Sequence, residues 1–303
     1  MMDNVQEIRE IVNPVFNTAK SCIQLDAASG DEDSRQLLGA LGFGGFADAK
    51  DNDRVPAELV EKVKRLFPIY TVLTDSRFQI VNNLIKSFSD RIVVDLPCGY
   101  TARGIKMSRQ GRVYYGFDLP VVIDEIAPAI AGICEKEPGI SKDKIHYCSV
   151  DATNYESMKK ALEGVKGRIC IITDGMLALF HRTELDEVCK AVRKLLMDFG
   201  GEWYTADAMS VELMALSFEG VMQKDPQIVR DAVVSGSAAQ SDIENSEYPF
   251  IRWTPQQLKK YMEETGFRVK ELPFSEKLPV LRSVDPQTME RLKASYTKMI
   301  EWR

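Results

Sequence analysis

The sequence predicts an α/β fold: an open, mostly parallel sheet of seven strands, preceded by a helical cap. Two observations predict it. From residue 91 onward, short runs of β-branched and other apolar residues alternate with amphipathic stretches at helical spacing. Before residue 91, the apolar residues recur at helical spacing. A chain of 303 residues is long enough for one large α/β domain or two small ones.

The first ninety residues predict helices that cover the rest of the molecule. The glycine-rich segment from Leu41 to Lys50 interrupts the helical spacing and separates the second helix from the third. We therefore take residues 1–89 as a helical cap or lid and residues 90–303 as the domain that holds the sheet. The predicted helices of the cap are residues 3–20, 33–41, 56–67 and 69–88.

Five strands of the sheet are predicted to be parallel, because each pair is separated by a helix. Strand–helix–strand repeats form right-handed crossovers and a sheet that is covered on both faces. The strands are residues 91–96, 112–117, 144–150, 168–173 and 202–207. The helices between them are residues 101–110, 121–135, 154–164 and 183–198.

The repetition ends after the fifth strand. Residues 208–235 are predicted to be helical and lead into a polar loop, so that about 208–250 forms an insertion in the lid. A helix follows from Thr254 to Thr265, and then two strands, 266–272 and 277–284, joined by a few residues. So short a link cannot hold a crossover helix, so this last pair is predicted to be antiparallel. A final helix is predicted at 285–301.

Composition and charge exclude several classes of protein. Lys and Arg number 39 against 45 Asp and Glu, for a net charge of −6, so nucleic acid is not an expected partner. No apolar run approaches the ~20 residues that cross a bilayer, and the opening MMDNVQEIRE lacks the apolar core of a signal peptide. The six cysteines form no CxxC pair, and there are only two histidines. We expect a cytoplasmic protein without a structural metal, either a monomer or a homodimer.

An aspartate stands at or just after the end of each parallel strand. In an open parallel sheet, ligands bind outside the carboxyl ends of the strands, where the chain reverses its direction of travel. A single aspartate at such a position is often only the cap of the next helix. All five together indicate a ligand site. The five are Asp95, Asp118, Asp151, Asp174 and Asp207.

The spacing of Gly99 and Asp118 indicates an adenosine ligand. Asp118 follows Gly99 by 19 residues, close to the offset at which a carboxylate binds ribose hydroxyls. The loop around Gly99 has a single central glycine, and Pro97 lacks an N–H, so it is a poor cradle for a diphosphate. NAD is therefore disfavoured, and an adenosine with a short amino-acid tail is favoured. The reversed last hairpin is typical of S-adenosylmethionine (SAM) methyltransferases.

The motif VVDLPCGYTARG followed by YYGFDLPVVID resembles the leucine carboxyl methyltransferase family, which includes bacterial O-methyltransferases. The resemblance covers about residues 69–207 and includes the strand-four segment Asp174–Phe180 and Arg77 in the preceding helix. Thr101 stands where the family has an aspartate, and Asp174 where it has a glutamate. The resemblance implies a class I, Rossmann-like SAM methyltransferase fold and SAM as the cofactor.

The resemblance also implies which residues hold each part of SAM. They are Asp95, Gly99, Arg77 and Asp174 for the methionine part, Asp118 for the ribose, and Leu119, Asp151 and Ala152 for the adenine.

The expected reaction is an in-line methyl transfer to an oxygen of a small molecule or a peptide. A carboxylate acceptor is already ionised and needs no base, whereas a hydroxyl acceptor would need one. His181, Tyr204 and Asp207 are the candidate bases. Two alternatives stay open: a SAM- or nucleotide-binding module without turnover, and an NAD-dependent oxidoreductase. The arginines available in the lid to hold a carboxylate acceptor are Arg35, Arg54, Arg230 and Arg252.

Overall fold

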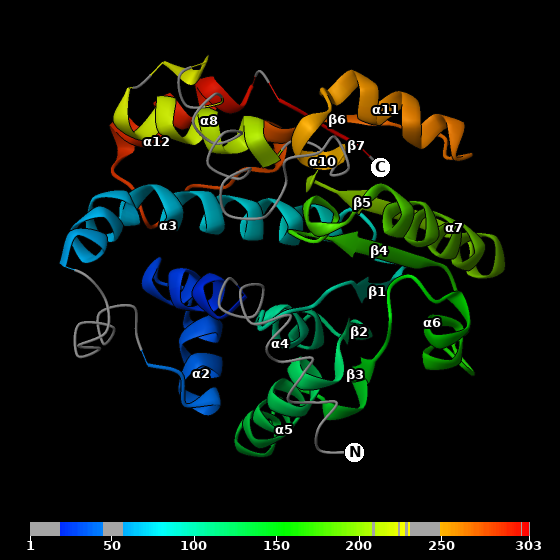
Figure 1. The fold of residues 1–303 in the computed structure, drawn as a ribbon. Coiled ribbons are helices and arrows are strands. Elements are labelled where there is room, and N and C mark those ends of the chain that lie inside the picture. The colour runs from blue at the N-terminus through cyan, green and yellow to red at the C-terminus, as the bar shows by residue number, and fades with distance from the viewer. Residues whose placement is uncertain are drawn as a thin grey trace.

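The fold is an open α/β sheet covered by helices on both faces (Figure 1). The computed structural model describes residues 19–44, 57–207, 210–223, 225–227, 230, 249–297 and 299–302. The strand order is β3-β2-β1-β4-β5-β7-β6. The first five strands are parallel, as predicted. They are β1 (Ile92–Asp95), β2 (Tyr114–Asp118), β3 (Ile145–Ser149), β4 (Ile169–Thr173) and β5 (Gly201–Thr205).

The chain reverses its direction of travel across the sheet between β1 and β4. Strand β1 pairs with β2 on one side, with Val93 opposite Tyr114, and with β4 on the other, with Val93 opposite Cys170. The connections after β1 and after β4 therefore leave this part of the edge in opposite directions. This is the topological switch point at which open parallel sheets bind ligands.

The predicted crossover helices are all present. They are α4 (Arg103–Arg109), α5 (Pro120–Lys136), α6 (Tyr155–Ala161) and α7 (Arg182–Phe199). Successive side chains of a strand point to opposite faces, and the core is divided in the same way. Val93 and Tyr204 belong to one apolar cluster, and their chain neighbours Val94 and Trp203 belong to the other.

The helices before the sheet differ from the prediction. Residues 19–28 are helical, and α2 (Glu32–Leu41) follows, with Asp31 as its N-cap and Gly42, at φ 68°, as its C-cap. The two predicted helices 56–67 and 69–88 are one continuous helix, α3 (Ala57–Lys86), that contains Pro68. The prediction of a break was wrong because a proline removes one helical hydrogen bond, a loss that tertiary packing can offset. Residues 3–18 of the first predicted helix lie outside the described residues.

Helix α3 shares the core of the sheet. Its side chains Val72, Ile80 and Leu84 are buried in the same cluster as Val93 of β1. In Figure 1, α3 runs between the sheet and the pair formed by α8 (Ser210–Met222) and α12 (Pro286–Tyr296). The opposite face is covered by α6, α7 and α11 (Pro255–Glu264), whose buried residues include Leu185 and Leu258.

The region after β5 is described in part. Helix α8 occupies the start of the predicted helix 208–235, and α10 (Pro249–Arg252) lies at the end of the predicted lid insertion. Residues 208–209, 224, 228–229 and 231–248 lie outside the described residues. Helix α11 begins where predicted, with Thr254 as N-cap and Gln257 completing a capping box.

The antiparallel edge is present, but the predicted residues were partly wrong. The first predicted strand shortens to β6 (Glu271–Pro273), and no strand forms at 277–284, which begins at the end of the 3-10 turn η5 (Phe274–Lys277). The partner is β7 (Ile300–Trp302), taken from the residues predicted to end the last helix. Trp302 lies opposite Thr205 of β5 and Glu271 of β6, so β7 is antiparallel to both neighbours.

None of the helices in the described residues is long and apolar enough to cross a bilayer. In the same part of the chain, no group of three or more His, Cys, Asp or Glu side chains is placed to hold a metal ion.

Candidate functional site

The five aspartates lie at the carboxyl ends of the parallel strands, as their positions in the sequence predicted. Asp95 and Asp118 are the last residues of β1 and β2. The remaining three follow β3, β4 and β5 within one or two residues: Asp151, Asp174 and Asp207. Their side chains make different contacts, which divide the site into the surroundings of Asp118, a charged centre and the surroundings of Asp151.

Asp118 contacts the loop between β1 and α4, where the sequence predicts the ribose of the ligand. Oδ2 of Asp118 accepts a hydrogen bond of 2.8 Å from the N–H of Gly99, and Oδ1 accepts one of 2.8 Å from the N–H of Leu119. Gly99 has φ 50°, a conformation that favours glycine. Burial raises the pKa of Asp118 to about 6, although the two backbone N–H groups act in the opposite direction. The thiol of Cys98 is also 4.0 Å from Oδ2. A carboxylate has about four lone pairs, so Oδ1 keeps an acceptor position for a ligand.

The charged centre is organised around Arg77 of α3. Its Nε lies 2.9 Å from Oδ1 of Asp174, Nη2 donates to the same oxygen, and Oδ1 of Asp207 is 3.5 Å from Nη2. Burial alone would raise the pKa of Asp174, but the guanidinium groups of Arg77 and Arg103 hold it below its ordinary value. Arg77 therefore links helix α3 to the segments that follow β4 and β5.

Asp207 fixes the loop that follows β4. Its carboxylate accepts three backbone hydrogen bonds: 2.6 Å from Gly175, 2.9 Å from Met176 and 2.7 Å from Leu177. The side chain is fully buried. These contacts use most of its acceptor positions and indicate that Asp207 orders the loop that carries Asp174.

Arg103, at the start of α4, lies beneath the same centre and was missed by the sequence reasoning. It is 1% exposed, and its Nη1 lies 2.5 Å from Oδ2 of Asp95. The same oxygen accepts a hydrogen bond of 2.9 Å from the hydroxyl of Tyr114, and Nε of Arg103 donates to Oδ1 of Asn82 at 3.2 Å. Burial raises the pKa of Asp95, and the adjacent guanidinium opposes that effect. The available signal was the place of Arg103 in the glycine-loop motif, four residues after Gly99.

The surroundings of Asp151 are more open. Asp151 is exposed, and its Oδ1 accepts hydrogen bonds from the N–H of Thr153 at 2.8 Å and from its hydroxyl at 2.6 Å. Oδ1 therefore closes a turn after β3. Ala152 is half-buried against the cluster on the α7 face, and Leu119 is half-buried at the N-cap of α5. The adenine roles of these three residues stay predictions.

The other two candidate bases lie in different settings. His181 is the N-cap residue of α7, and its backbone N–H donates to Oε2 of Glu184 at 3.0 Å. Tyr204 is 1% exposed and belongs to the apolar cluster on the α3 face of the sheet. A catalytic role for His181 or Tyr204 stays a prediction.

The helix of residues 19–28 lies over the glycine loop. A Cβ placed on Gly99 would be 3.9 Å from Cβ of Ala19. One residue further, Nζ of Lys20 lies 3.5 Å from Oε2 of Glu125 and 5.7 Å from the centre of the Tyr100 ring. This helix therefore covers the place where the sequence predicts the methionine part of SAM.

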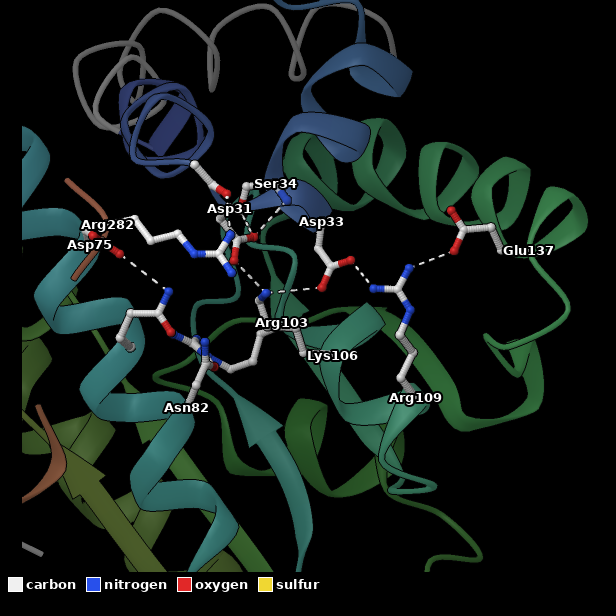
Figure 2. A network of polar contacts seen from close by, with 12 residues as sticks. Asp31, Asp33, Ser34, Asp75, Asn82, Arg103, Lys106, Arg109, Glu137 and Arg282 are labelled. Carbon is white, nitrogen blue, oxygen red and sulfur yellow. Dashed lines mark hydrogen bonds and ion pairs between the residues drawn. The ribbon is translucent and has the colours of Figure 1, made fainter. Parts of the chain in front are cut away.

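The next helix, α2, is fastened to α4 by a network of charged groups (Figure 2). Nζ of Lys106 lies 2.6 Å from Oδ2 of Asp31 and 3.1 Å from Oδ2 of Asp33. Arg109 also pairs with Asp33 and extends the network to Glu137 at 2.6 Å. Lys106 and Arg109 are on α4, so α2 is fixed to the helix that follows the glycine loop.

The lid arginines that are described have partners of their own. Nη1 of Arg35 lies 3.1 Å from Oε2 of Glu32, and Nε of Arg230 donates to Oε1 of Glu212 at 2.7 Å. Arg54 and the side chain of Arg252 lie outside the described residues. A role for any of the four in holding an acceptor stays a prediction.

Two surface hollows lie away from the site. One of about 410 Å³ is lined by residues at the amino ends of β1 and β2, among them Arg91 and Arg112. The other, of about 680 Å³, lies between α8 and α12 and includes Glu219 and Arg291. Neither hollow includes any of the five aspartates.

Comparison with known proteins gave weak likenesses. No protein-family model matches the chain, and no curated protein sequence does. One matching solved structure comes from work on the conversion of a disulfide bond into a thioacetal group during echinomycin biosynthesis. It has 16% identity and a TM-score of 0.30, over 42% of this chain and 48% of that one. Another is PKMT2 from Rickettsia typhi in complex with AdoHcy, with 12% identity and a TM-score of 0.28, over 59% of this chain and 33% of that one.

The match spans about half the length of the first of these two chains and a third of the second. Likenesses at these TM-scores are too weak to assign a fold or a function. The function is therefore inferred from the geometry of the site.

Proposed function

We propose that this protein is a SAM-dependent methyltransferase that transfers a methyl group to an oxygen of a small molecule or a peptide. The observation that carries the proposal is the contact between Asp118 at the end of β2 and the N–H of Gly99, at 2.8 Å. In open parallel sheets, the acidic residue after the second strand and the glycine loop after the first together bind the ribose of a nucleoside. Oδ1 of Asp118 keeps an acceptor position for a ribose hydroxyl.

The backbone of the loop supports SAM over a dinucleotide. The N–H of Cys98 donates to the carbonyl of Phe117 at 2.9 Å, and that of Gly99 donates to Asp118. Pro97 has no N–H to offer. A diphosphate is bound by free N–H groups of such a loop at the start of a helix, and three of the loop positions here offer none. An adenosine with an amino-acid tail does not need them.

The charge of the centre also supports SAM. Two arginines, Arg77 and Arg103, face three carboxylates, so the centre carries one net negative charge when all five groups are ionised. The three carboxylates are Asp95, Asp174 and Asp207. SAM carries a positive sulfonium in addition to its ammonium and carboxylate, and a site with excess negative charge favours such a ligand.

The edge of the sheet agrees with this assignment. Strand β7 is antiparallel and lies between β5 and β6, the reversed edge that is typical of SAM methyltransferases. The resemblance of the motifs around Gly99 and Asp118 to the leucine carboxyl methyltransferase family points the same way.

An oxygen acceptor that is already ionised suits the site best. Methyl transfer is an in-line displacement at a carbon with a good leaving group, so the protein aligns the reactants and excludes water. The helix of residues 19–28 is placed to exclude water, because Ala19 packs near Gly99. Asp207, one candidate base, already accepts three backbone hydrogen bonds. These contacts favour a carboxylate acceptor over an alcohol that must be deprotonated.

A SAM-binding module without turnover is the second candidate. The contacts of Asp207 favour it, because this candidate base already accepts three backbone hydrogen bonds, and binding alone needs no base. An enzyme and a binding module differ in one observable: only the enzyme converts SAM to S-adenosylhomocysteine in proportion to the acceptor supplied.

The test has two stages. First, SAM, NAD and ATP are added separately, and the shift in the melting temperature of the protein is measured. SAM is expected to give the largest shift. A larger shift with NAD would contradict the proposal. Second, the protein is incubated with methyl-labelled SAM and a metabolite extract, and labelled products are analysed by mass spectrometry before and after mild base. Loss of the label in base indicates a methyl ester, and a base-stable N- or C-methyl product would contradict the oxygen assignment. Asp118→Ala serves as the control that removes SAM binding.

A further inference from the structure

Polar atoms without hydrogen-bond partners are concentrated around Arg103. Three of them are donors: Nη2 of Arg103, Nδ2 of Asn82 and the hydroxyl of Thr101. Two are acceptors: Oδ1 of Asp95 and Oδ1 of Asp26. All five are buried atoms with no hydrogen-bond partner among the described residues. Buried polar groups in native proteins are nearly always paired, so a group of unpaired ones indicates a ligand or ordered water.

Direct contacts bring most of these atoms together. Arg103 donates from Nε to the other end of the Asn82 amide at 3.2 Å and from Nη1 to the other oxygen of Asp95 at 2.5 Å. Its Nη2 is 3.7 Å from Oδ2 of Asp174, too far for a hydrogen bond. Figure 2 shows Asn82 of α3 and Arg103 of α4 facing each other beneath the helices that cover the site. Asn82 and Asp95 therefore each combine one satisfied polar atom with one unsatisfied atom, and Arg103 has two satisfied nitrogens and one unsatisfied nitrogen.

The remaining two atoms come from neighbouring segments. Thr101 is two residues before Arg103, in the loop that also holds Gly99. Asp26 belongs to the helix of residues 19–28 and is 2% exposed. Burial raises the pKa of Asp26, as do the charges of Asp75 and Asp31, whereas the charge of Arg103 opposes them. The cluster is thus formed by Arg103 of α4, Asn82 of α3 and Asp26 of the helix of residues 19–28, together with Asp95 and Thr101.

The donors and acceptors match the two charged groups of an amino acid. A carboxylate accepts hydrogen bonds only, and it fits the three donors on Arg103, Asn82 and Thr101. An ammonium donates only, and it fits the two acceptors on Asp95 and Asp26. A purely anionic ligand would leave the two carboxylate oxygens of Asp95 and Asp26 unpaired, and a purely cationic ligand would leave the three donors unpaired.

We propose that Asn82, Thr101 and Arg103 bind the carboxylate of the amino-acid end of SAM, and that Asp95 and Asp26 bind its ammonium. The inference rests on the proposed function and changes one role that the family resemblance implied. Arg77 is committed to Asp174 and Asp207 and acts as a positioning residue for the loop after β4. The carboxylate is instead held by the arginine that the sequence reasoning missed.

The experiment compares two ligands that differ at the amino-acid end. S-adenosylhomocysteine carries the zwitterion, and 5′-methylthioadenosine lacks it, so the ratio of their dissociation constants isolates the contribution of this cluster. Calorimetry on the native chain is expected to show S-adenosylhomocysteine binding at least about 100-fold more tightly. Thr101→Val and Asn82→Ala are each expected to weaken S-adenosylhomocysteine about tenfold and to leave 5′-methylthioadenosine within about twofold.

The control is Asn83→Ala, the next residue of the same helix. Nδ2 of Asn83 donates to the carbonyl of Lys277 at 2.9 Å, away from Arg103, so the ratio is expected to stay at the native value. Arg103→Met removes a fully buried charge and is a poor test because it endangers folding. Thr101→Val keeps the shape of the side chain and removes only the hydroxyl, so the ratio of dissociation constants in this variant is the most direct test of the inference.

Each outcome supports or overturns the inference. A fall in the ratio with Thr101→Val and Asn82→Ala, and not with Asn83→Ala, supports it. Equal weakening of both ligands, or no change in either variant, overturns it and indicates that ordered water fills the cluster. If the native chain binds both ligands equally, the inference fails while the adenosine site stands. If it binds neither ligand and not SAM, the proposed function fails as well.

Discussion

Arg77 donates from both Nε and Nη2 to a single oxygen of Asp174, and the Nε distance is 2.9 Å. The second oxygen of Asp174 is left facing Arg103 at 3.7 Å. One carboxylate is therefore shared by two arginines from different helices, α3 and α4. Both side chains of the Arg77–Asp174 pair are mostly buried, so the pair is screened little by solvent.

Replacement of Arg77 by methionine is expected to lower the free energy of unfolding by about 3 kcal/mol, because it leaves a buried carboxylate without its main partner. The pKa of Asp174 is below its ordinary value in the folded state, so the pair stabilises the fold above the unfolded pKa. That contribution is lost as the pH falls through the folded pKa. Urea unfolding should show a constant difference above about pH 5 that narrows below about pH 4.

The matching control is the double variant Arg77→Met, Asp174→Asn. It removes both charges and is expected to be more stable than Arg77→Met alone. A single variant as stable as the native protein at pH 7 would contradict the assignment of this pair.

A second prediction concerns the pH dependence of nucleoside binding. Hydroxyl donors stabilise the ionised form of Asp118, whose pKa is raised to about 6 by burial in the unliganded site. The dissociation constant of S-adenosylhomocysteine should rise about tenfold per pH unit below pH 6 and be flat above pH 7.

The same group affects the stability of the fold. Because the pKa of Asp118 is higher in the folded than in the unfolded state, its ionisation lowers the free energy of unfolding as the pH rises through about 6.

Calorimetry between pH 5 and pH 8 measures the pH dependence of binding. Asp118→Asn removes the titrating group and should bind more weakly with no step near pH 6. An unchanged step in Asp118→Asn would assign the titration to another group.

A third prediction concerns Arg112, which closes the carboxyl end of α3. Its Nη1 donates to the carbonyl of Ile85 at 2.8 Å, and its Nη2 donates to the carbonyls of Phe88 at 2.7 Å and Arg91 at 3.1 Å. A cation at the carboxyl end of a helix satisfies free carbonyls and interacts favourably with the helix dipole. Arg112→Met is expected to cost about 2–4 kcal/mol in urea unfolding. Arg168→Met, at an exposed arginine, should cost about 0.5 kcal/mol or less, and equal costs would refute the assignment.

A fourth prediction concerns Gly201, the first residue of β5. It has φ 123°, and a Cβ at this position would lie 1.8 Å from the carbonyl oxygen of Ile169 on the neighbouring strand. Gly201→Ala is expected to lower the melting temperature by more than about 10 °C or to prevent soluble expression. Gly139→Ala is the control, since its Cβ meets nothing within 4 Å and should leave the melting temperature within about 2 °C. Similar melting temperatures for both variants would contradict this view of the β4–β5 pairing.

The parallel strands could be predicted because their signal is local. Each is a short apolar run that ends at or near an aspartate, and burial on both faces requires little else. Strand β7 could not be predicted in this way, because Ile300–Trp302 continues an amphipathic helical pattern. Its strand conformation depends on the pairing of Trp302 with Thr205 and Glu271, residues that are far away in the sequence. Pro68 misled the prediction for a related reason: local propensity indicated a break that packing overrides.

The aspartates of the site were predictable from their positions after the strands, but their partners were not. An arginine in a helix is usually solvated, so Arg103 carried no signal of burial. Its position depends on Asn82 of α3 and on Asp95 at the end of β1, two partners from different elements that no local pattern relates to it. Likewise, no spacing in the sequence relates Asp207 to the loop of Gly175, 32 residues earlier.

The antiparallel edge has a consequence for synthesis of the chain. Strand β6 joins the sheet through β7, which is inserted between it and β5. The residues of β6 leave the ribosome before those of β7, so this strand has no place in the sheet until Trp302 has emerged. The five parallel strands can pair earlier. Folding of the nascent chain should therefore proceed in two stages, with the parallel core first and the reversed edge added only after translation has passed residue 302.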